Sequence, residues 1–358
     1  MTAASGAEDL SVLFGTHVSG PGLGFSIAHF DTTTGVLTKP KFLLEASAPA
    51  YFVFAKGGRM LYTCNSPGFV SAYKVDPAKE ELTFLNQQPS GGGDPSYISL
   101  DKTEKYVFVA NYQGGSIAAW ALKPDGSLGE RTAFIQHSGH GVNPLRQTHA
   151  YAHSIVIDPS NRFALVADLG LDKLFIYKFD VANGSLTPNN PAYVDITPGD
   201  GARHVIFHPN GRWVYLVTEM GNTVHLFNWD GQHGTLTEKQ SISTLPADFH
   251  GVSTSADIKT SPDGRFLYTS NRGYDSIAVF SINQEDGRLT SIQYMPSGGK
   301  WPRNFELDPS GHWMIATNHN SNNAAVFQID QKTGKLTAVG KPVDVPFPFS
   351  PRFLEPQK

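Results

Sequence analysis

The sequence has almost no cysteine, no long apolar run and no cluster of basic residues. Its one cysteine, Cys64, cannot form a disulfide within the chain, which suits a reducing compartment. No stretch of about 18 apolar residues is present, so we expect no membrane-spanning helix. The first nine residues lack the basic start and apolar core of a secretory signal. These absences together predict a cytoplasmic protein that does not associate with membranes.

Helical periodicity is also missing, and the net charge is small. With 28 basic and 32 acidic residues the formal net charge is −4, and no block of lysine or arginine favours nucleic acid as a partner. Hydrophobic residues make up 40% of the chain, which is enough for a large core. The apolar residues recur with a period near two, so strands are predicted throughout. The 35 glycines and 24 prolines fit a chain with many tight turns.

A Gly-x-Leu turn recurs along the chain and divides it into seven units. The turn is degenerate once, at Glu80–Leu82, and the seven leucines lie 45, 46, 58, 50, 53 and 47 residues apart. Each unit has a polar turn such as 261–265, a β-branched and aromatic strand, a second turn, and an alternating strand. Four short strands in about 45–50 residues are typical of a β-propeller blade. The sequence therefore predicts an all-β, seven-bladed propeller.

The two ends of the chain predict how the ring closes. The first unit begins at Leu13 without an opening strand, and residues 349–354 resemble an opening strand with nothing after it. We therefore expect the C-terminal strand to complete blade 1, which also removes exposed sheet edges. The predicted organisation is a flexible N-terminus over residues 1–10 and a single domain over residues 11–358.

Aligned repeats predict which residues meet at the mouth of the central channel. Counting back from the polar turn of each unit gives one position on each innermost strand: Ala50, Ser96, His153, Arg203, Ala256 and Arg303, with Arg352 expected as the seventh. The matching positions on the next strand are Ser66, Tyr112, Leu169, Glu219, Arg272 and His319. His153, Arg203, Glu219, Arg272 and Arg303 thus fall at equivalent places, and buried charge is costly unless it is compensated.

Two interpretations of this charged ring stay open. Several arginines around a pocket suit an anionic ligand, because each guanidinium can bind a carboxylate or phosphate through two hydrogen bonds. A histidine and a glutamate nearby suit proton transfer. The alternative is a ring of salt bridges that plugs the channel.

The longest interval contains a histidine-rich insertion, residues 137–153. Four histidines lie in it, but no cysteine or glutamate accompanies them, and zinc sites need a defined ligand set. We therefore expect no metal. The insertion is predicted to be a loop that covers the channel mouth, with Arg146 and His149 as substrate contacts.

Several motifs resemble those of a known family. They are Asn143-Pro144-x-Arg146-Gln147 with His149 and His153-Ser154, residues 168–172, Gly201-Ala202-Arg203-His204, residues 207–211, residues 270–277 and Pro302-Arg303-Asn304-Phe305. Together they resemble the seven-bladed β-propeller lactonases, which include propeller-type 6-phosphogluconolactonases and the fungal 3-carboxy-cis,cis-muconate lactonizing enzyme. The resemblance covers the chain from about residue 11 to residue 353.

The resemblance implies a site and a set of reactions. The catalytic residues it implies are His153, Glu219, Arg203 and Arg272, with Arg303 as a further substrate contact and no metal or organic cofactor. The reaction it implies first is hydrolysis of 6-phospho-D-glucono-1,5-lactone, a step of the pentose phosphate pathway, with a small anionic molecule as substrate. The alternatives are a cycloisomerase acting on a carboxymuconate and a non-enzymatic scaffold. The sequence leaves open whether His153 or Glu219 is the base and whether the chain forms a homo-oligomer.

Overall fold

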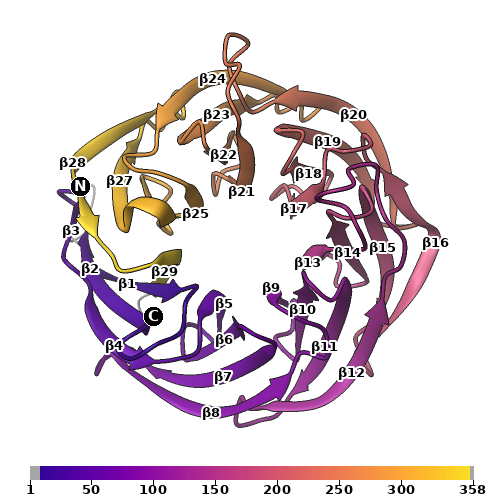
Figure 1. Cartoon of the computed structure of the whole chain (residues 1–358), viewed down its shortest axis with the longest axis horizontal. Helices are drawn as coiled ribbons and strands as arrows, with labels where there is room; N and C mark the ends of the chain where they lie inside the picture. Colours follow the sequence, from indigo (N-terminus) through magenta and orange to yellow (C-terminus); the bar gives the residue numbers. More distant parts are fainter. Residues whose placement is uncertain (1–8, 355–358) are drawn as a thin grey trace, which may run out of the picture.

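The computed structural model describes residues 9–354 and shows seven antiparallel sheets arranged around one central axis (Figure 1). The predicted seven-bladed β-propeller is confirmed. The described part contains one helical turn, η1 (His319–Ser321), and therefore no helix that is long and apolar enough to cross a membrane. Residues 1–8 of the predicted flexible N-terminus lie outside the described residues.

The strands of each blade run side by side from the central channel to the rim. Blade 1 contains β29 (Pro348–Leu354), β1 (Asp9–Thr16), β2 (Gly24–Asp31) and a divided outer strand, β3 (Val36–Leu37) and β4 (Lys41–Glu45). Blade 2 contains β5 (Pro49–Ala55), β6 (Met60–Asn65), β7 (Phe69–Asp76) and β8 (Glu81–Pro89). Blade 3 contains β9 (Pro95–Leu100), β10 (Tyr106–Asn111), β11 (Ser116–Leu122) and β12 (Leu128–Gln136).

The remaining four blades follow the same order. Blade 4 contains β13 (Ala152–Ile157), β14 (Phe163–Asp168), β15 (Lys173–Asp180) and β16 (Ser185–Asp195). Blade 5 contains β17 (Ala202–Phe207), β18 (Trp213–Thr218), β19 (Thr223–Asp230) and β20 (Thr235–Ser243). Blade 6 contains β21 (Thr254–Thr260), β22 (Phe266–Arg272), β23 (Ser276–Ile282) and β24 (Leu289–Pro296). Blade 7 contains β25 (Pro302–Leu307), β26 (Trp313–Asn318), β27 (Asn323–Ile329) and β28 (Leu336–Asp344).

The two ends of the chain close the ring. Strand β29 pairs antiparallel with β1, with Ser11 opposite Leu354 and Thr16 opposite Pro348. The C-terminal strand is therefore the innermost strand of blade 1, as predicted. Strand β1 begins at Asp9, two residues before the predicted start of the domain.

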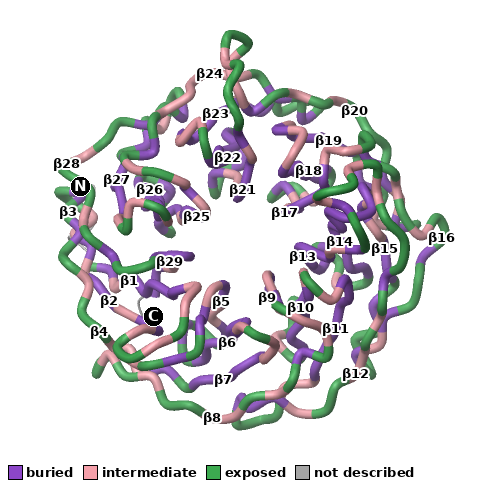
Figure 2. Tube along the Cα trace, in the orientation of Figure 1, coloured by how far each residue is buried: buried purple, intermediate pink, exposed green. Residues whose placement is uncertain are grey.

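Burial explains why the blades stack. The second strand of blades 2 to 7 is buried at every residue, because each lies inside its own sheet and between neighbouring blades. Outer strands such as β8 and β20 are half-exposed, and Figure 2 shows the exposed segments on the rim. Cys64 is fully buried in β6 and behaves as a small core residue.

The recurrent glycine of the Gly-x-Leu turn joins one blade to the blade before it. Gly287 has a φ of +79°, and a Cβ there would lie 2.5 Å from the Trp213 ring of blade 5. Gly184 has a φ of +75°, and a Cβ there would lie 2.3 Å from the Tyr106 ring of blade 3. In addition, the Tyr215 hydroxyl donates a hydrogen bond of 2.7 Å to the Gly287 carbonyl. The repeat found in the sequence is therefore a contact between blades as well as a turn.

Replacing this glycine should destabilise the ring more than replacing a glycine in open space. Gly287→Ala introduces a clash with Trp213 and a strained backbone, whereas Gly57→Ala, at φ +64° with no atom within 4 Å, introduces only the backbone strain. We expect Gly57→Ala to lower the free energy of unfolding by about 1–2 kcal/mol. Gly287→Ala should cost about 1–3 kcal/mol more. Urea denaturation measures both, and equal losses would contradict the packing role.

Candidate active site

A β-bulge near the start of each innermost strand turns one side chain toward the channel mouth. In blade 4, Ala152 pairs with Asp168 and Ser154 pairs with Ala167, so His153 is the extra residue. A register shift at this place occurs in every blade; it skips one residue of the innermost strand in five blades and two residues in blades 2 and 6. Bulges of this kind re-aim side chains. The seven positions form what we call the bulge ring: Ala50, Ser96, His153, Arg203, Ala256, Arg303 and Phe349.

A second set of residues lies at the end of each second strand. These positions, here called the strand-end ring, are Ser66, Tyr112, Leu169, Glu219, Arg272, His319 and His17. The sequence alignment found six of them. It missed His17, because blade 1 lacks the polar turn from which the positions were counted.

The prediction that Arg352 is the seventh member of the bulge ring is wrong. The register places Phe349 there, and Arg352 lies three residues further along β29, where its Nη1 atom is 2.8 Å from Oε2 of Glu306. A signal for the correct residue was present in the sequence. A proline directly precedes the bulge in four blades, including Pro302 before Arg303 and Pro348 before Phe349.

Glu219 is the centre of the charged cluster and contacts three guanidinium groups. Its Oε2 atom lies 3.1 Å from Nε of Arg203 and 2.9 Å from Nη2 of Arg272, and its Oε1 atom lies 2.5 Å from Nη2 of Arg146. Burial alone would raise the pKa of Glu219, but Arg272 and Arg203 hold it well below the usual range. Glu219 is thus a carboxylate at neutral pH and a weak base.

Positive charge at the mouth exceeds negative charge. Four arginines lie in this part of the channel, and the carboxylate of Glu219 is the acid that pairs with three of them. Arg303, the fourth, has a buried Nε atom without a hydrogen-bond partner, and its guanidinium lies 4.5 Å from the centre of the Phe349 ring. Burial and Arg272 lower the pKa of Arg303 to about 9. Such an excess of buried positive charge favours an anionic ligand.

His153 supplies a neutral imidazole beside these arginines. It is almost fully buried, and its Nδ1 atom has no hydrogen-bond partner among the described residues. Its ring lies against Tyr112 at 5.3 Å and against His204 at 5.1 Å between ring centres. Burial and Arg203 hold the pKa of His153 well below its usual range. The imidazole is therefore unprotonated at neutral pH and can accept a proton.

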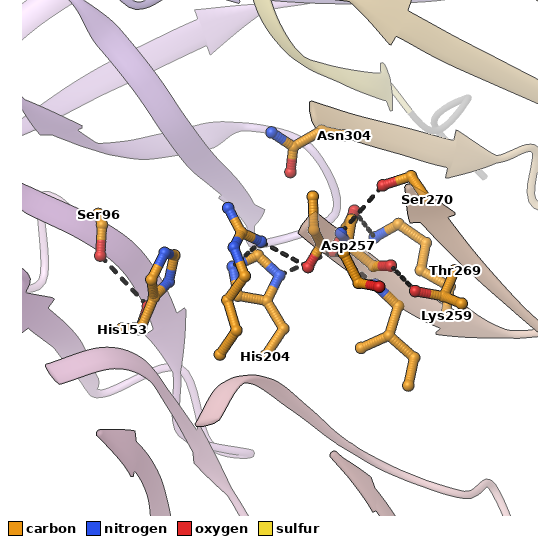
Figure 3. A network of polar contacts seen from close by, with 12 residues as sticks. Ser96, His153, His204, Asp257, Lys259, Thr269, Ser270 and Asn304 are labelled. Atoms are coloured by element: carbon orange, nitrogen blue, oxygen red, sulfur yellow. Dashed lines mark hydrogen bonds and ion pairs between the residues drawn. The ribbon is translucent and has the colours of Figure 1, made fainter. Parts of the chain in front are cut away.

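His204 and Asp257 position Arg203, and the sequence analysis did not single them out. Nδ1 of His204 lies 2.9 Å from Oδ1 of Asp257, and Nε2 lies 3.2 Å from Nη1 of Arg203. A guanidinium can only donate, so Nε2 accepts and Nδ1 carries the proton that is donated to Asp257. Figure 3 shows His204 between His153 and Asp257. The dyad fixes one side of the Arg203 guanidinium while Glu219 fixes the other.

Deeper in the channel the charges balance. Asp257 is 3.9 Å from Lys259, which is 3.4 Å from Glu306, which in turn pairs with Arg352. Acid and base alternate along this chain, so it needs no ligand. The salt-bridge plug considered from the sequence therefore describes this deeper layer, while the uncompensated mouth has the properties of a ligand site.

The insertion delivers Arg146 to the cluster but does not bring His149 there. Arg146 contacts Glu219, and the Asn143 side chain accepts hydrogen bonds from the backbone of residues 145 and 146, which fixes the turn. His149 instead bonds to the Gln113 carbonyl at 3.0 Å and stacks on Tyr151, so it touches none of the charged groups.

The other buried histidine of the insertion has a structural position. His137 lies 2.7 Å from Asp168 and 2.8 Å from the Tyr177 hydroxyl, which attaches the insertion to blade 4. Over residues 9–354, no group of three or more potential metal ligands converges. The expectation of a metal-free site stays a prediction.

The buried dyad makes stability depend on pH. Burial and Arg203 lower the pKa of His204 to about 4, against 6.5 for an ordinary histidine. Between these values the unfolded chain binds a proton that the folded chain does not. The contribution of His204 is therefore complete above pH 6.5 and is lost as the pH falls toward 4, by about 1.4 kcal/mol per unit.

A His204→Gln variant lacks this titration, so its deficit in unfolding free energy relative to wild type should shrink between pH 7 and pH 4. The exposed His140→Gln is the control, and denaturant unfolding at several pH values measures both. A deficit that stays constant over this pH range would contradict the assignment.

Known proteins resemble this chain along most of its length. A family model described as a seven-bladed β-propeller lactonase matches residues 11–353. The 6-phosphogluconolactonase of Bacillus subtilis is 35% identical over 297 residues, which cover 82% of this chain and 84% of the relative. That of Formosa agariphila is 32% identical over 300 residues, which cover 80% and 83%.

Solved structures show the same relation. The periplasmic gluconolactonase PpgL of Pseudomonas aeruginosa superimposes with a TM-score of 0.90 at 31% identity, covering 97% of this chain and 99% of that one. The fold, the matched family model and these relatives lead to one conclusion: the chain belongs to the seven-bladed β-propeller lactonase family.

Proposed function

We propose that this enzyme hydrolyses 6-phospho-D-glucono-1,5-lactone to 6-phosphogluconate, with His153 as the general base. The observation that carries the proposal is the mouth of the channel, where four arginines and one carboxylate, which pairs with three of them, lie beside a neutral buried histidine. An anionic lactone would compensate the excess charge. The names of the two 6-phosphogluconolactonase relatives support the same substrate.

Each step has a residue suited to it. Arg203 and Arg272 would donate to the lactone carbonyl oxygen, which gains negative charge when water attacks the carbonyl carbon. His153 would take the proton of that water and then return it to the ring oxygen when the carbon–oxygen bond of the ring breaks. The product is the open-chain hydroxy acid, so no further reactant is needed.

Glu219 has a different role in this proposal. A carboxylate held by three guanidinium groups accepts a proton poorly, whereas the imidazole of His153 has a nitrogen without a partner. We therefore assign Glu219 to the positioning of Arg146, Arg203 and Arg272. A cytoplasmic location stays a prediction, because a relative of the same fold is named as periplasmic.

Loss of His153 should abolish most of the catalysis. His153→Ala should lower kcat by about 10²–10⁴-fold, the usual contribution of a general base. Arg203→Met should lower kcat by about 10²-fold or more through the lost contact to the oxyanion. The assay follows 6-phosphogluconate through coupled NADP reduction on freshly generated lactone, with the uncatalysed rate subtracted.

His140→Ala, on the exposed part of the insertion, is the matched control and should keep the wild-type rate. A wild type that is no faster than background rules out this substrate, and a carboxymuconate would be tested next. An active wild type with an equally active His153→Ala rules out the proposed base.

The low pKa of His153 predicts the acid side of the pH profile. A base must be unprotonated to act, so kcat/KM falls as the pH drops through the pKa of the base in the free enzyme. Because that pKa lies well below 6.5, kcat/KM should stay level as the pH is lowered from 7.5 to 6.5. A pH–rate profile corrected for background hydrolysis measures this, and a decline already centred at or above pH 6.5 would refute it.

A further inference from the structure

Three nitrogen atoms at the junction of blades 7 and 1 are buried and have no hydrogen-bond partner in the part of the chain that the structure describes. They are Nδ1 of His17, Nδ1 of His319 and Nε of Arg303. The His17 and His319 rings meet edge to face, with 3.8 Å between their centres. Leaving a buried polar atom unpaired costs free energy, so three together in a channel mouth require an explanation.

Within residues 9–354, no carboxylate forms an ion pair with His17, His319 or Arg303. His17 and His319 are neighbours in the strand-end ring, and Arg303 belongs to the bulge ring of blade 7. Burial and the neighbouring His319 and Arg303 lower the pKa of His17 to about 4, and burial and Arg303 also lower that of His319. Glu219 and Asp94 act on Arg303 without pairing with it, and they only partly offset the lowering of its pKa. The cluster is therefore electrically incomplete.

Arg303 links this cluster to the proposed catalytic groups. Its guanidinium lies 4.5 Å from the centre of the Phe349 ring, and the His17 ring stacks on the same Phe349 ring at 6.2 Å between centres. On the other side, the like charges of Arg272 and Arg203 lower the pKa of Arg303. A ligand that bridges Arg303 would therefore have one end near the histidine pair and the other near His153 and Glu219.

We propose that His17, His319 and Arg303 form a subsite for the phosphomonoester group of the substrate. The proposal rests on the proposed function, and it deepens that function by separating the group that holds the phosphate from the group that acts on the lactone carbonyl. A phosphate carries close to two negative charges and several acceptor oxygens at neutral pH, which suits a guanidinium flanked by two imidazoles.

The hydrogen bonds of the two histidines predict a proton linked to binding. The backbone at Phe347 partly offsets the lowered pKa of His17, and the backbone at Pro348 does the same for His319, which is the effect of a carbonyl oxygen close to a ring N–H. Because Nδ1 of each ring has no partner among the described residues, we assign this N–H to Nε2. A neutral imidazole has one N–H, so Nδ1 of each ring carries a lone pair in the free protein. The oxygens of a phosphate dianion only accept, so a ring that keeps its proton on Nε2 must gain a second proton to donate from Nδ1 to the phosphate. The positive charge of Arg303 lowers the pKa of both rings, and the adjoining residues 347–349 carry no charge.

The first test is substrate discrimination. The ratio of kcat/KM for 6-phosphogluconolactone to that for glucono-1,5-lactone would be measured for wild type, His17→Gln, His319→Gln and the double variant. We expect this ratio to fall at least tenfold in the double variant. His233→Gln, an exposed histidine paired with Asp230 on the rim, is the control. An unchanged ratio, or an equal loss on both lactones, would overturn the subsite.

The second test is binding and does not depend on turnover. Calorimetric titration with 6-phosphogluconate and with inorganic phosphate, in buffers of different ionisation enthalpy at pH 7.5, should show proton uptake in wild type and less in each variant. Equal affinity and equal proton uptake in wild type and the double variant would overturn the proposal, as would tighter binding of citrate than of 6-phosphogluconate.

The two proposals fail in different ways. If wild type hydrolyses neither lactone, the proposed function fails, and the titrations alone decide whether the anion subsite exists. If wild type hydrolyses the unphosphorylated lactone as well as the phosphorylated one, the catalytic assignment stands and the phosphate subsite is overturned. Thermal unfolding monitored by circular dichroism confirms that each variant is folded, and the volume-conserving glutamines limit the disturbance of the paired rings.

Discussion

The pairing of β29 with β1 is the constraint on which the rest of the molecule depends. A propeller blade has a free edge on the inside and another on the outside, and only closure of the ring brings seven inner edges to one axis. Here the closing sheet is shared between the two ends of the chain, with Val12 opposite Phe353 and Leu13 opposite Arg352. Phe349 and His17 reach the channel mouth from opposite ends of the sequence because of this pairing.

The distribution of charge along the channel distinguishes a structural layer near Glu306 from the proposed catalytic site near Glu219. Near Glu306 every charge has a counterpart, and the residues hold neighbouring inner strands together. Near Glu219 the arginines outnumber the carboxylate, and the free protein bears the electrostatic cost of keeping them together. A bound anion would remove that cost. Binding strength at such a site would come from charge that the fold has already gathered, with little rearrangement of side chains.

Much of this could be predicted from the sequence, because the repeat fixes equivalent positions. The fold follows from seven units at six similar intervals, and Arg203, Glu219 and Arg272 follow from a constant offset to the polar turn of each unit. Counting from the polar turn does not give the correct positions in blade 1, because the strands of this blade come from both ends of the chain. It therefore chose Arg352 in place of Phe349 and omitted His17.

The remaining gaps have another cause. His204 meets Asp257 across two blades, and this contact depends on the bulge that turns both strands. The direction of His149 depends on how the insertion folds over Tyr151. Neither a contact between blades nor the direction of a loop side chain is contained in a one-dimensional alignment of repeats.

The bulge ring has a consequence for how such a site can diversify. Every blade contributes one side chain at this level, and the backbone bulge that presents it is the same whichever residue occupies it. Ala50, Ser96 and Ala256 fill three of the seven positions with small side chains. Replacing one of them with a larger or charged residue would change the wall of the mouth at one blade. The side chains of the other six blades would stay where they are. Substrate preference in this architecture can thus drift in seven separable steps without rebuilding the scaffold.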